Sequence, residues 1–232
     1  MRIESNVRFS LIVPTRNRLD RLCIMLDSFY SNANLPERVE TILLADYDDL
    51  STRNWDRFLK DRNIKITFQR RSPFISKHYV NWGMQCSTGQ YVWLLNDDTT
   101  CETKHWDDTL FQKAQEFKKD TPLFYGWIGD DTLGNRQDDI GCCFPVLSKE
   151  TVDLLENFGN EIEHWGYDCC LYQVFPKDKI CDLRDTIKIK HWCRHNKTAD
   201  ADETALHVGK ISRMALLTPD QKKYWTDLLN TT

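Results

Sequence analysis

The chain has 232 residues, of which 41% are hydrophobic and 12% aromatic, and its formal net charge is −4. This composition suits a globular protein with a sizeable core and argues against intrinsic disorder. Lysines and arginines are interspersed with acidic residues and form no basic stripe, which argues against nucleic acid as the main partner.

No apolar stretch is long enough for a transmembrane segment, and residues 1–5 lack the apolar core of a signal peptide. Nine cysteines are present, with the adjacent pairs Cys142-Cys143 and Cys169-Cys170 and no Cys-x-x-Cys. This odd number and spacing make a poor disulfide framework, so we expect most of them to be reduced thiols packed as small hydrophobic side chains. The sequence therefore predicts a soluble protein in a reducing compartment, with a cytoplasmic location.

The first hundred residues alternate between strand patterns and helix patterns. Apolar runs predict four strands, at 9–13, 39–45, 64–68 and 91–95. Between them, apolar residues at a helical period predict three helices, at 19–30, 55–59 and 75–86. Such β-α-β alternation implies right-handed crossovers and a mainly parallel α/β sheet with helices on its faces.

The pattern changes from about residue 106 onwards. Three amphipathic helices are predicted, at 106–117, 152–158 and 171–175. Two further strands are predicted, at 144–147 and 187–191. The stretch 126–131 is predicted to be a loop too polar to belong to the core. Near the end of the chain, Thr218, Pro219 and Gln221 have the residue types and spacing of a helix start with a capping box.

The stretch from Tyr91 to Thr99 is the most informative part of the sequence. Its apolar strand stops abruptly at Asn96-Asp97-Asp98, and parallel sheets bind ligands outside the carboxyl ends of their strands. Adjacent carboxylates repel one another unless a cation holds them, and a hard divalent ion held by carboxylates and substrate phosphates completes such a site. The stretch therefore predicts a metal–phosphate site, although taken alone it also fits a polar turn that caps the strand.

Five segments of the first half carry a family resemblance when taken in order. They are Phe9–Arg18, with Pro-Thr-Arg-Asn at its centre, then Val39–Asp46, Asn81-x-Gly83, Ser87–Tyr91 and Leu95–Thr99. Together they resemble the GT-A nucleotide-diphospho-sugar transferases, especially the family 2 glycosyltransferases, over roughly residues 8–175. The resemblance implies a single GT-A domain over 1–232, in which residues 1–100 bind the nucleotide sugar and residues 101–232 hold the acceptor and the catalytic base.

The resemblance also implies a reaction and the residues that serve it. The expected reaction is inverting and metal-dependent, and it transfers a sugar from a nucleotide-diphosphate sugar to a hydroxyl of a glycan or other acceptor. The donor expected first is a UDP-sugar. The expected nucleotide-sugar-binding residues are Pro14, Thr15 and Arg16 around the nucleoside, Asp46 at the base or ribose, and Asn81, Asn96 and Asp97.

Asp98 takes the last acidic position of the family's Asp-x-Asp motif and is the expected main ligand of Mn²⁺ or Mg²⁺. The first acidic position is Asn96 in this chain, which leaves Asp97 as a second contact. Taken alone, Asp46 also fits a strand cap and Arg16 a solvated residue at a helix start.

Residues 164–168, His-Trp-Gly-Tyr-Asp, resemble the segment that supplies the catalytic base in inverting members. Asp168 matches that base, and Tyr167 stands where a glutamate is usual. An acceptor hydroxyl needs a carboxylate within hydrogen-bond reach to take its proton, and a helix N-terminus holds such a carboxylate charged. Without the resemblance, Asp168 would equally fit an aspartate that only stabilises the helix dipole.

Strand alternation at 191–195 puts His191, Cys193 and His195 on one face. Related transferases often place a histidine in a late strand as a metal ligand or beside the diphosphate. Each histidine is therefore either a metal ligand or an ordinary, partly buried residue.

Two rival functions remain open at this point. A sugar-phosphate nucleotidylyltransferase shares the layered fold but needs a glycine-rich first loop, and residues 14–17 contain no glycine. A nucleotide-sugar-binding module without turnover is the second rival, and it is favoured by the departures at Asn96 and Tyr167.

Overall fold

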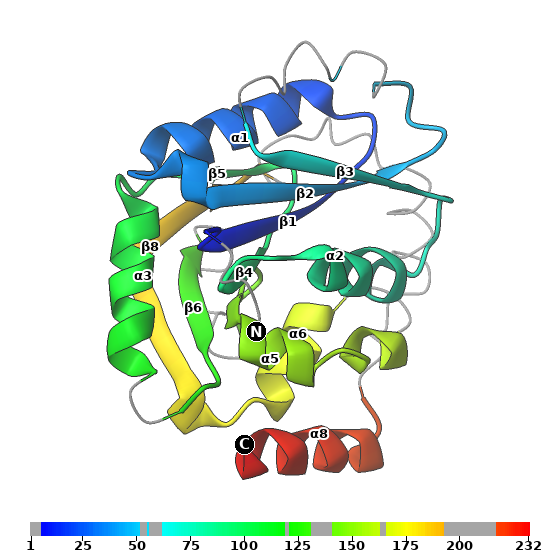
Figure 1. Cartoon of the computed structure of the whole chain (residues 1–232). Helices are drawn as coiled ribbons and strands as arrows, with labels where there is room; N and C mark the ends of the chain where they lie inside the picture. The colour runs from blue at the N-terminus through cyan, green and yellow to red at the C-terminus, as the bar shows by residue number, and fades with distance from the viewer. Residues whose placement is uncertain are drawn as a thin grey trace.

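The computed structural model describes residues 6–51, 55, 62–118, 121–130, 141–162, 166–192 and 217–232. Within these ranges the strands form one eight-stranded sheet in the order β3-β2-β1-β4-β7-β6-β8-β5 (Figure 1). The sheet is mixed, and the predicted mainly parallel first half is confirmed.

Four parallel strands make up the first half of the sheet: β1 (Phe9–Thr15), β2 (Val39–Asp46), β3 (Ile64–Gln69) and β4 (Tyr91–Leu94). Strand β2 is buried along its whole length and β1 along nearly all of it. This explains their continuous aliphatic sequence, because a parallel strand covered on both faces needs no polar side.

Helices cover both faces of these strands (Figure 1). On one face, Phe29 of α1 (Leu19–Asn32) packs edge-on against Trp93 of β4, with ring centroids 5.2 Å apart. On the other face, α2 (Asn81–Cys86) continues a π-helical turn, η3 (Ser76–Val80), so the helix predicted at 75–86 is confirmed. A short 3-10 helix, η1 (Pro36–Arg38), leads into β2. Apart from Trp55, the helix predicted at 55–59 lies outside the described residues.

Gly83 lets α2 approach the sheet closely. A Cβ at this position would meet the side chains of Ile12 and Leu44. We therefore expect Gly83→Ala to destabilise the fold by about 1–3 kcal/mol, the usual cost of overpacking. Urea denaturation should show the loss, and Gln85→Ala on the exposed side of the same helix is the matched control. An unchanged denaturation midpoint for Gly83→Ala would contradict this packing.

The second half of the sheet is mixed. Strand β7 (Val146–Ser148) runs antiparallel to β4 and to β6 (Tyr125–Asp130), and β8 (Ile180–His191) runs parallel to β6 and antiparallel to β5 (Thr99–Cys101). The strand predicted at 144–147 is thus observed two residues later, and the strand predicted at 187–191 is the end of a longer one.

The prediction of a loop at 126–131 was wrong for residues 126–130, which belong to β6 and are buried. Its glycines have a packing role, because a Cβ on Gly129 would meet backbone carbonyl oxygens of Arg184 and Ile187 in the neighbouring strand β8. The ladder is irregular between Ile128 and Gly129, and a glycine inside a strand often marks such a bulge. Asp131 lies outside the described residues.

The remaining helices pack around this mixed half. Helix α3 was predicted at its observed position, and the helix predicted at 152–158 is split into α5 and η5. The bounds are α3 (Trp106–Phe117), α5 (Lys149–Leu154), η5 (Phe158–Glu161), α6 (Tyr167–Val174), η6 (Lys177–Lys179) and α8 (Pro219–Thr231).

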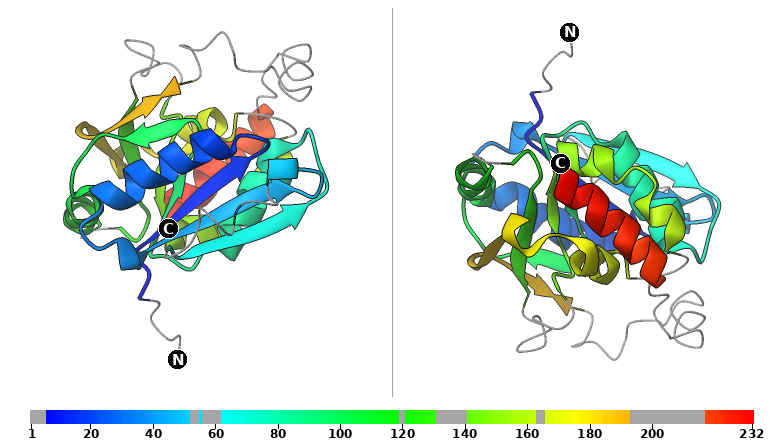
Figure 2. Two further views of the ribbon diagram at one scale, coloured as in Figure 1. Left: turned by 90° about the horizontal axis from the view of Figure 1, so that it is seen from above. Right: turned by 90° about the horizontal axis from the view of Figure 1, so that it is seen from below.

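The C-terminal helix α8 begins as predicted. The side chain of Thr218 accepts a hydrogen bond from the backbone N–H of Gln221, and the Gln221 side chain accepts one from the backbone N–H of Thr218. The two views of Figure 2 place α8 and α1 on opposite sides of the molecule.

Eight cysteines lie in the described part of the chain, and they are free thiols. Four of them are buried in the packed interior: Cys101, Cys142, Cys169 and Cys170. Across the same ranges, no helix has the length and apolar character needed to cross a membrane.

Candidate functional site

Strands β1, β2 and β4 end at the same edge of the sheet and bring polar residues together there. Thr15, at the end of β1, donates a hydrogen bond of 2.8 Å to Asp97, which follows β4. Arg16, the next residue after β1, pairs at 2.8 Å with Asp46 at the end of β2. Residues predicted as binding residues from three separate segments therefore converge, as expected for parallel strands.

Asp46 is held from two sides. Its Oδ2 accepts from Arg16, its Oδ1 accepts from the hydroxyl of Tyr79, and its side chain is 4% exposed. Arg16 also forms two hydrogen bonds with Asp48, at 2.5 and 3.0 Å. These bonds to Asp48, and that to Asp46, raise the pKa of Arg16 above its ordinary value against the opposing effect of burial. Each carboxylate oxygen keeps a second lone pair, so Asp46 can still accept a bond from a ligand.

Tyr79 lies between this cluster and the π-helical turn. Burial, and its hydrogen bond to Asp46, raise the pKa of the Tyr79 phenol well above its usual range. Its hydroxyl also accepts a bond of 3.2 Å from the backbone N–H of Ser72. The phenol therefore remains a neutral donor that fixes the orientation of the Asp46 carboxylate. No feature of the sequence assigned this role to Tyr79.

Asp97 and Asp98 are both buried but are held differently. Burial raises the pKa of Asp97 to about 6, although Arg18 lowers it, and the neighbouring charge of Asp98 adds to the rise. For Asp98, burial also opposes ionisation, but His191 and Arg18 outweigh it and hold the pKa below its ordinary value. At neutral pH Asp98 is therefore the better-stabilised carboxylate of the two.

His191 reaches this pair from the other half of the sheet. It is the last residue of β8, where it lies opposite Thr99 in the ladder with β5. Its Nε2 lies 3.3 Å from Oδ1 of Asp98, and its Nδ1 lies 4.0 Å from Oδ2 of Asp130. Asp130 escaped the sequence interpretation because it ends the strand that had been predicted as a loop. His195 lies outside the described residues.

The Asp98 carboxylate and the His191 imidazole are suitable ligands for a divalent metal ion. Within the described ranges, no three His, Cys, Asp or Glu side chains converge into a complete protein-made metal site. Oδ1 of Asp98 is nevertheless buried without a hydrogen-bond partner, and the imidazole of His191 lies beside it. Mg²⁺ in particular is usually bound by one or two carboxylates together with substrate phosphates, so these two side chains fit a site that a diphosphate completes.

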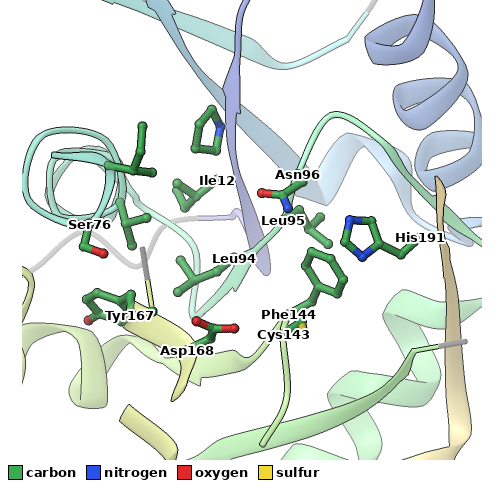
Figure 3. A pocket seen from close by; sticks show the side chains of 14 residues that line it. Ile12, Ser76, Leu94, Leu95, Asn96, Cys143, Phe144, Tyr167, Asp168 and His191 are labelled. Atoms are coloured by element: carbon green, nitrogen blue, oxygen red, sulfur yellow. The ribbon is translucent and has the colours of Figure 1, made fainter. Parts of the chain in front are cut away.

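A cavity of about 240 Å³ lies next to this cluster (Figure 3). Pro14, Asn96, Asp168 and His191 are the predicted site residues in its lining. Asp168 and Tyr167 lie on one side of the view in Figure 3, and Asn96 and His191 on the other. The rest of the lining is mainly apolar and includes Ile12, Ile75, Val80, Leu94, Leu95 and Phe144.

Asp168 occupies the first turn of α6, behind Gly166. Gly166 has φ of 107°, a left-handed conformation that glycine adopts without strain. Burial raises the pKa of Asp168 to about 6, against backbone N–H groups at the helix start that lower it. A carboxyl group of this kind is ionised for most of the time at pH 7 and is a stronger base than an ordinary aspartate.

Tyr167 and Asn81 are both held in place by contacts with other elements. Tyr167 packs edge-on against Phe158, with ring centroids 5.2 Å apart, and burial raises the pKa of its phenol. The amide nitrogen of Asn81 donates a 3.0 Å bond to the carbonyl of Glu156, which ties α2 to the segment before η5. Asn81 is not among the residues that line the cavity, and its role toward the nucleotide sugar stays a prediction.

Comparison with known proteins identifies the family. The family model described as Glycosyl transferase family 2 matches residues 10–174, more than half of the chain. The chain belongs to glycosyl transferase family 2. The resemblance to the family 2 glycosyltransferases is thereby confirmed. Among curated proteins, none matches this chain.

Several solved structures share the fold of this chain. TarS of S. aureus aligns with a TM-score of 0.60 at 15% identity, over 78% of this chain and 36% of TarS. A TarS 1-349 complex with UDP-GlcNAc aligns with a TM-score of 0.57 at 14% identity, over 79% of this chain and 58% of that one. The mannosyltransferase PcManGT from Pyrobaculum calidifontis, in complex with GDP-Man and Mn²⁺, aligns with a TM-score of 0.53 at 18% identity, over 75% and 56%. These similarities confirm the GT-A fold.

Proposed function

We propose that this family 2 glycosyltransferase is inverting and metal-dependent, and that it transfers a sugar from a nucleotide-diphosphate sugar to an acceptor hydroxyl in glycan or polysaccharide synthesis. The observation that carries the proposal is the shared cavity, where Asp168 faces the same space as Asn96 and His191. The proposed base on α6 and the proposed diphosphate site, which takes Asn96 after β4 and His191 at the end of β8, therefore border one volume.

Nucleotide sugars bound to the structural neighbours support the class of donor. TarS 1-349 was solved with UDP-GlcNAc and PcManGT with GDP-Man and Mn²⁺. In this chain, Asp98 and His191 would hold the ion, with Asp97 beside them. The ion supplies Lewis-acid neutralisation of the charge on the departing nucleoside diphosphate.

Asp168 would act on the acceptor. Its carboxylate takes the proton of the attacking hydroxyl, and the pKa of about 6 keeps it ionised and basic near neutral pH. The apolar walls formed by Ile12, Leu94 and Phe144 restrict water around the reacting groups, which limits hydrolysis of the donor. Attack from the face opposite the leaving group then inverts the anomeric configuration.

Asp46 is the proposed ligand of the nucleoside. We expect Asp46→Ala to weaken binding of free nucleotide and of nucleotide sugar alike, by about 1.5–3 kcal/mol, the usual contribution of a hydrogen bond to a charged group. Isothermal titration calorimetry measures both. Tyr79→Phe is the matched variant, because it removes the donor that orients Asp46 but keeps the carboxylate, and it should cause a smaller loss. If Asp46→Ala weakened neither ligand, Asp46 would be only a strand cap.

The test of the proposed function is a panel of nucleotide sugars with Mn²⁺, assayed for transfer and for slow hydrolysis of the donor. Release of a nucleoside diphosphate that stops with a chelator supports a metal-dependent transferase. Tight nucleotide-sugar binding without turnover for any sugar or acceptor would favour the binding module. Production of a nucleotide sugar from a sugar phosphate and a nucleoside triphosphate would favour the nucleotidylyltransferase.

A further inference from the structure

Arg18 lies next to the carboxylates of Asp97 and Asp98, the two acidic residues that follow β4. Its Nη1 is 3.1 Å from Oδ1 of Asp97 and 3.9 Å from Oδ2 of Asp98. The arginine side chain is 34% exposed, whereas the side chains of Asp97 and Asp98 are 4% and 9% exposed. Arg18, the residue that precedes α1, is therefore a partly exposed cation next to two buried carboxylates.

The same positive charge is needed in two different situations. While no divalent ion is bound, two adjacent buried carboxylates repel one another, and the guanidinium beside them offsets this repulsion. A divalent ion held by Asp98 would add a second cation next to the guanidinium, which lies 3.9 Å from the Asp98 carboxylate. Arg18 would then be repelled by the ion and attracted to the phosphate oxygens that bind with it.

We propose that Arg18 exchanges partners during donor binding, from the carboxylates of Asp97 and Asp98 to the diphosphate of the nucleotide sugar. This inference rests on the proposed function, since it needs a diphosphate and a divalent ion at Asp98. A guanidinium matches phosphate oxygens with two parallel N–H donors, and its long side chain lets it move between the two anions. Asp97 keeps the hydrogen bond from Thr15 when Arg18 leaves.

Arg16 differs from Arg18 in a way that separates their roles. Arg16 is 19% exposed and forms three hydrogen bonds to Asp46 and Asp48, so it is fixed at the nucleoside end. Arg18 is 34% exposed, and its Nη1 lies 3.1 Å from Asp97 and 3.9 Å from Asp98. The more exposed of the two arginines is therefore the one beside the acidic pair.

The exchange has opposite effects on the two ligands, and Arg18→Gln tests this directly. Without the Arg18 guanidinium, binding of Mn²⁺ alone should tighten by about threefold or more, because no positive charge then competes with the ion for the carboxylates. Removing the phosphate ligand should weaken binding of UDP or GDP at saturating Mn²⁺ by about tenfold or more, as expected for lost charge-assisted bonds. Calorimetry measures both affinities on the full chain.

Two companion variants complete the experiment. Arg18→Lys keeps the charge but loses the forked geometry, so it should leave Mn²⁺ affinity near that of the native chain and weaken UDP or GDP binding to an intermediate degree. Arg62→Gln breaks an exposed pair with Asp27, elsewhere on α1, and should change neither affinity. Thermal melts of each variant report folding independently.

The outcomes distinguish this inference from the proposed function. If native protein binds UDP or GDP with Mn²⁺ but Arg18→Gln shifts both affinities in the same direction or shifts neither, the exchange is wrong and the transferase function stands. If nucleotide binding needs Arg18 and is unaffected by Mn²⁺ or a chelator, Arg18 replaces the ion permanently and the exchange is also wrong. If native protein binds neither nucleotide, both the exchange and the proposed function fail.

Discussion

Asp168→Asn is expected to reduce sugar transfer by about 100-fold or more while leaving donor and metal affinity nearly unchanged. Asparagine has the size of aspartate but cannot take a proton from the acceptor hydroxyl. Asp168 also lies across the cavity from Asn96 and His191, so the change does not touch the groups proposed to hold the diphosphate. Steady-state kinetics with an active donor and acceptor, together with donor titrations, measure both parts of the expectation.

The control for this variant is Asp178→Asn, which makes the same exchange at the exposed start of η6. It should retain full transfer activity. The product of the native enzyme should have inverted anomeric configuration, because a single displacement assisted by a general base attacks opposite the leaving group. A retained configuration, or full activity of Asp168→Asn, would place the base on another residue.

The raised pKa of Asp168 also gives Asp168→Asn a stability signature. Between its ordinary value of 3.8 and about 6, the unfolded chain loses the proton while the folded chain keeps it, so native stability falls as pH rises through about 6. Asparagine removes that loss. At pH 8 the free energy of unfolding of Asp168→Asn should therefore exceed that of the native protein by roughly 1–2 kcal/mol, after allowing for partial solvent screening. Near pH 4 the two proteins should be equally stable. Urea denaturation at both pH values measures the difference. In the native enzyme the rate of transfer should fall as the pH drops below about 6, because Asp168 then gains a proton and cannot act as a base.

The sequence predicted the first half of the molecule well for a physical reason. Parallel strands buried on both faces are continuous apolar runs, and they were recognisable in β1, β2 and β4 without knowledge of their neighbours. Once the strands are parallel, their carboxyl ends must lie at one edge. The meeting of Asp46 and Asp98 at that edge therefore followed from topology.

The second half resisted prediction because its local sequence conflicts with its place in the sheet. Strand β6 contains glycines that are poor strand residues by themselves, and only the approach of β8 at Gly129 shows why a side chain cannot stand there. Asp130 was missed with that strand. Contacts such as Arg18 with Asp97 join residues 79 positions apart, and no local pattern specifies which acid an arginine reaches.

Asp98→Ala should abolish the dependence of nucleotide binding on the divalent ion. Asp98 is the better-ionised carboxylate of the pair, its Oδ1 has no hydrogen-bond partner, and His191 lies 3.3 Å away. Removing one partner of a buried charge pair costs about 2–5 kcal/mol, so affinity for UDP or GDP with Mn²⁺ should fall by roughly 100-fold or more, to the level seen with a chelator. Calorimetry with and without Mn²⁺ measures the difference.

The comparison with Asp97→Ala sharpens this last expectation. Asp97 already accepts bonds from Thr15 and Arg18, and burial raises its pKa to about 6, so it is less available to an added ion than Asp98. Its loss should weaken Mn²⁺-dependent binding less than the loss of Asp98 does. Asp98→Asn, which keeps the side-chain size, separates the lost charge from a collapsed site, and circular dichroism confirms that each variant is folded. Equal losses for Asp97→Ala and Asp98→Ala would mean that the two carboxylates share the ion, and unchanged Mn²⁺-dependent affinity in Asp98→Ala would remove Asp98 from the site.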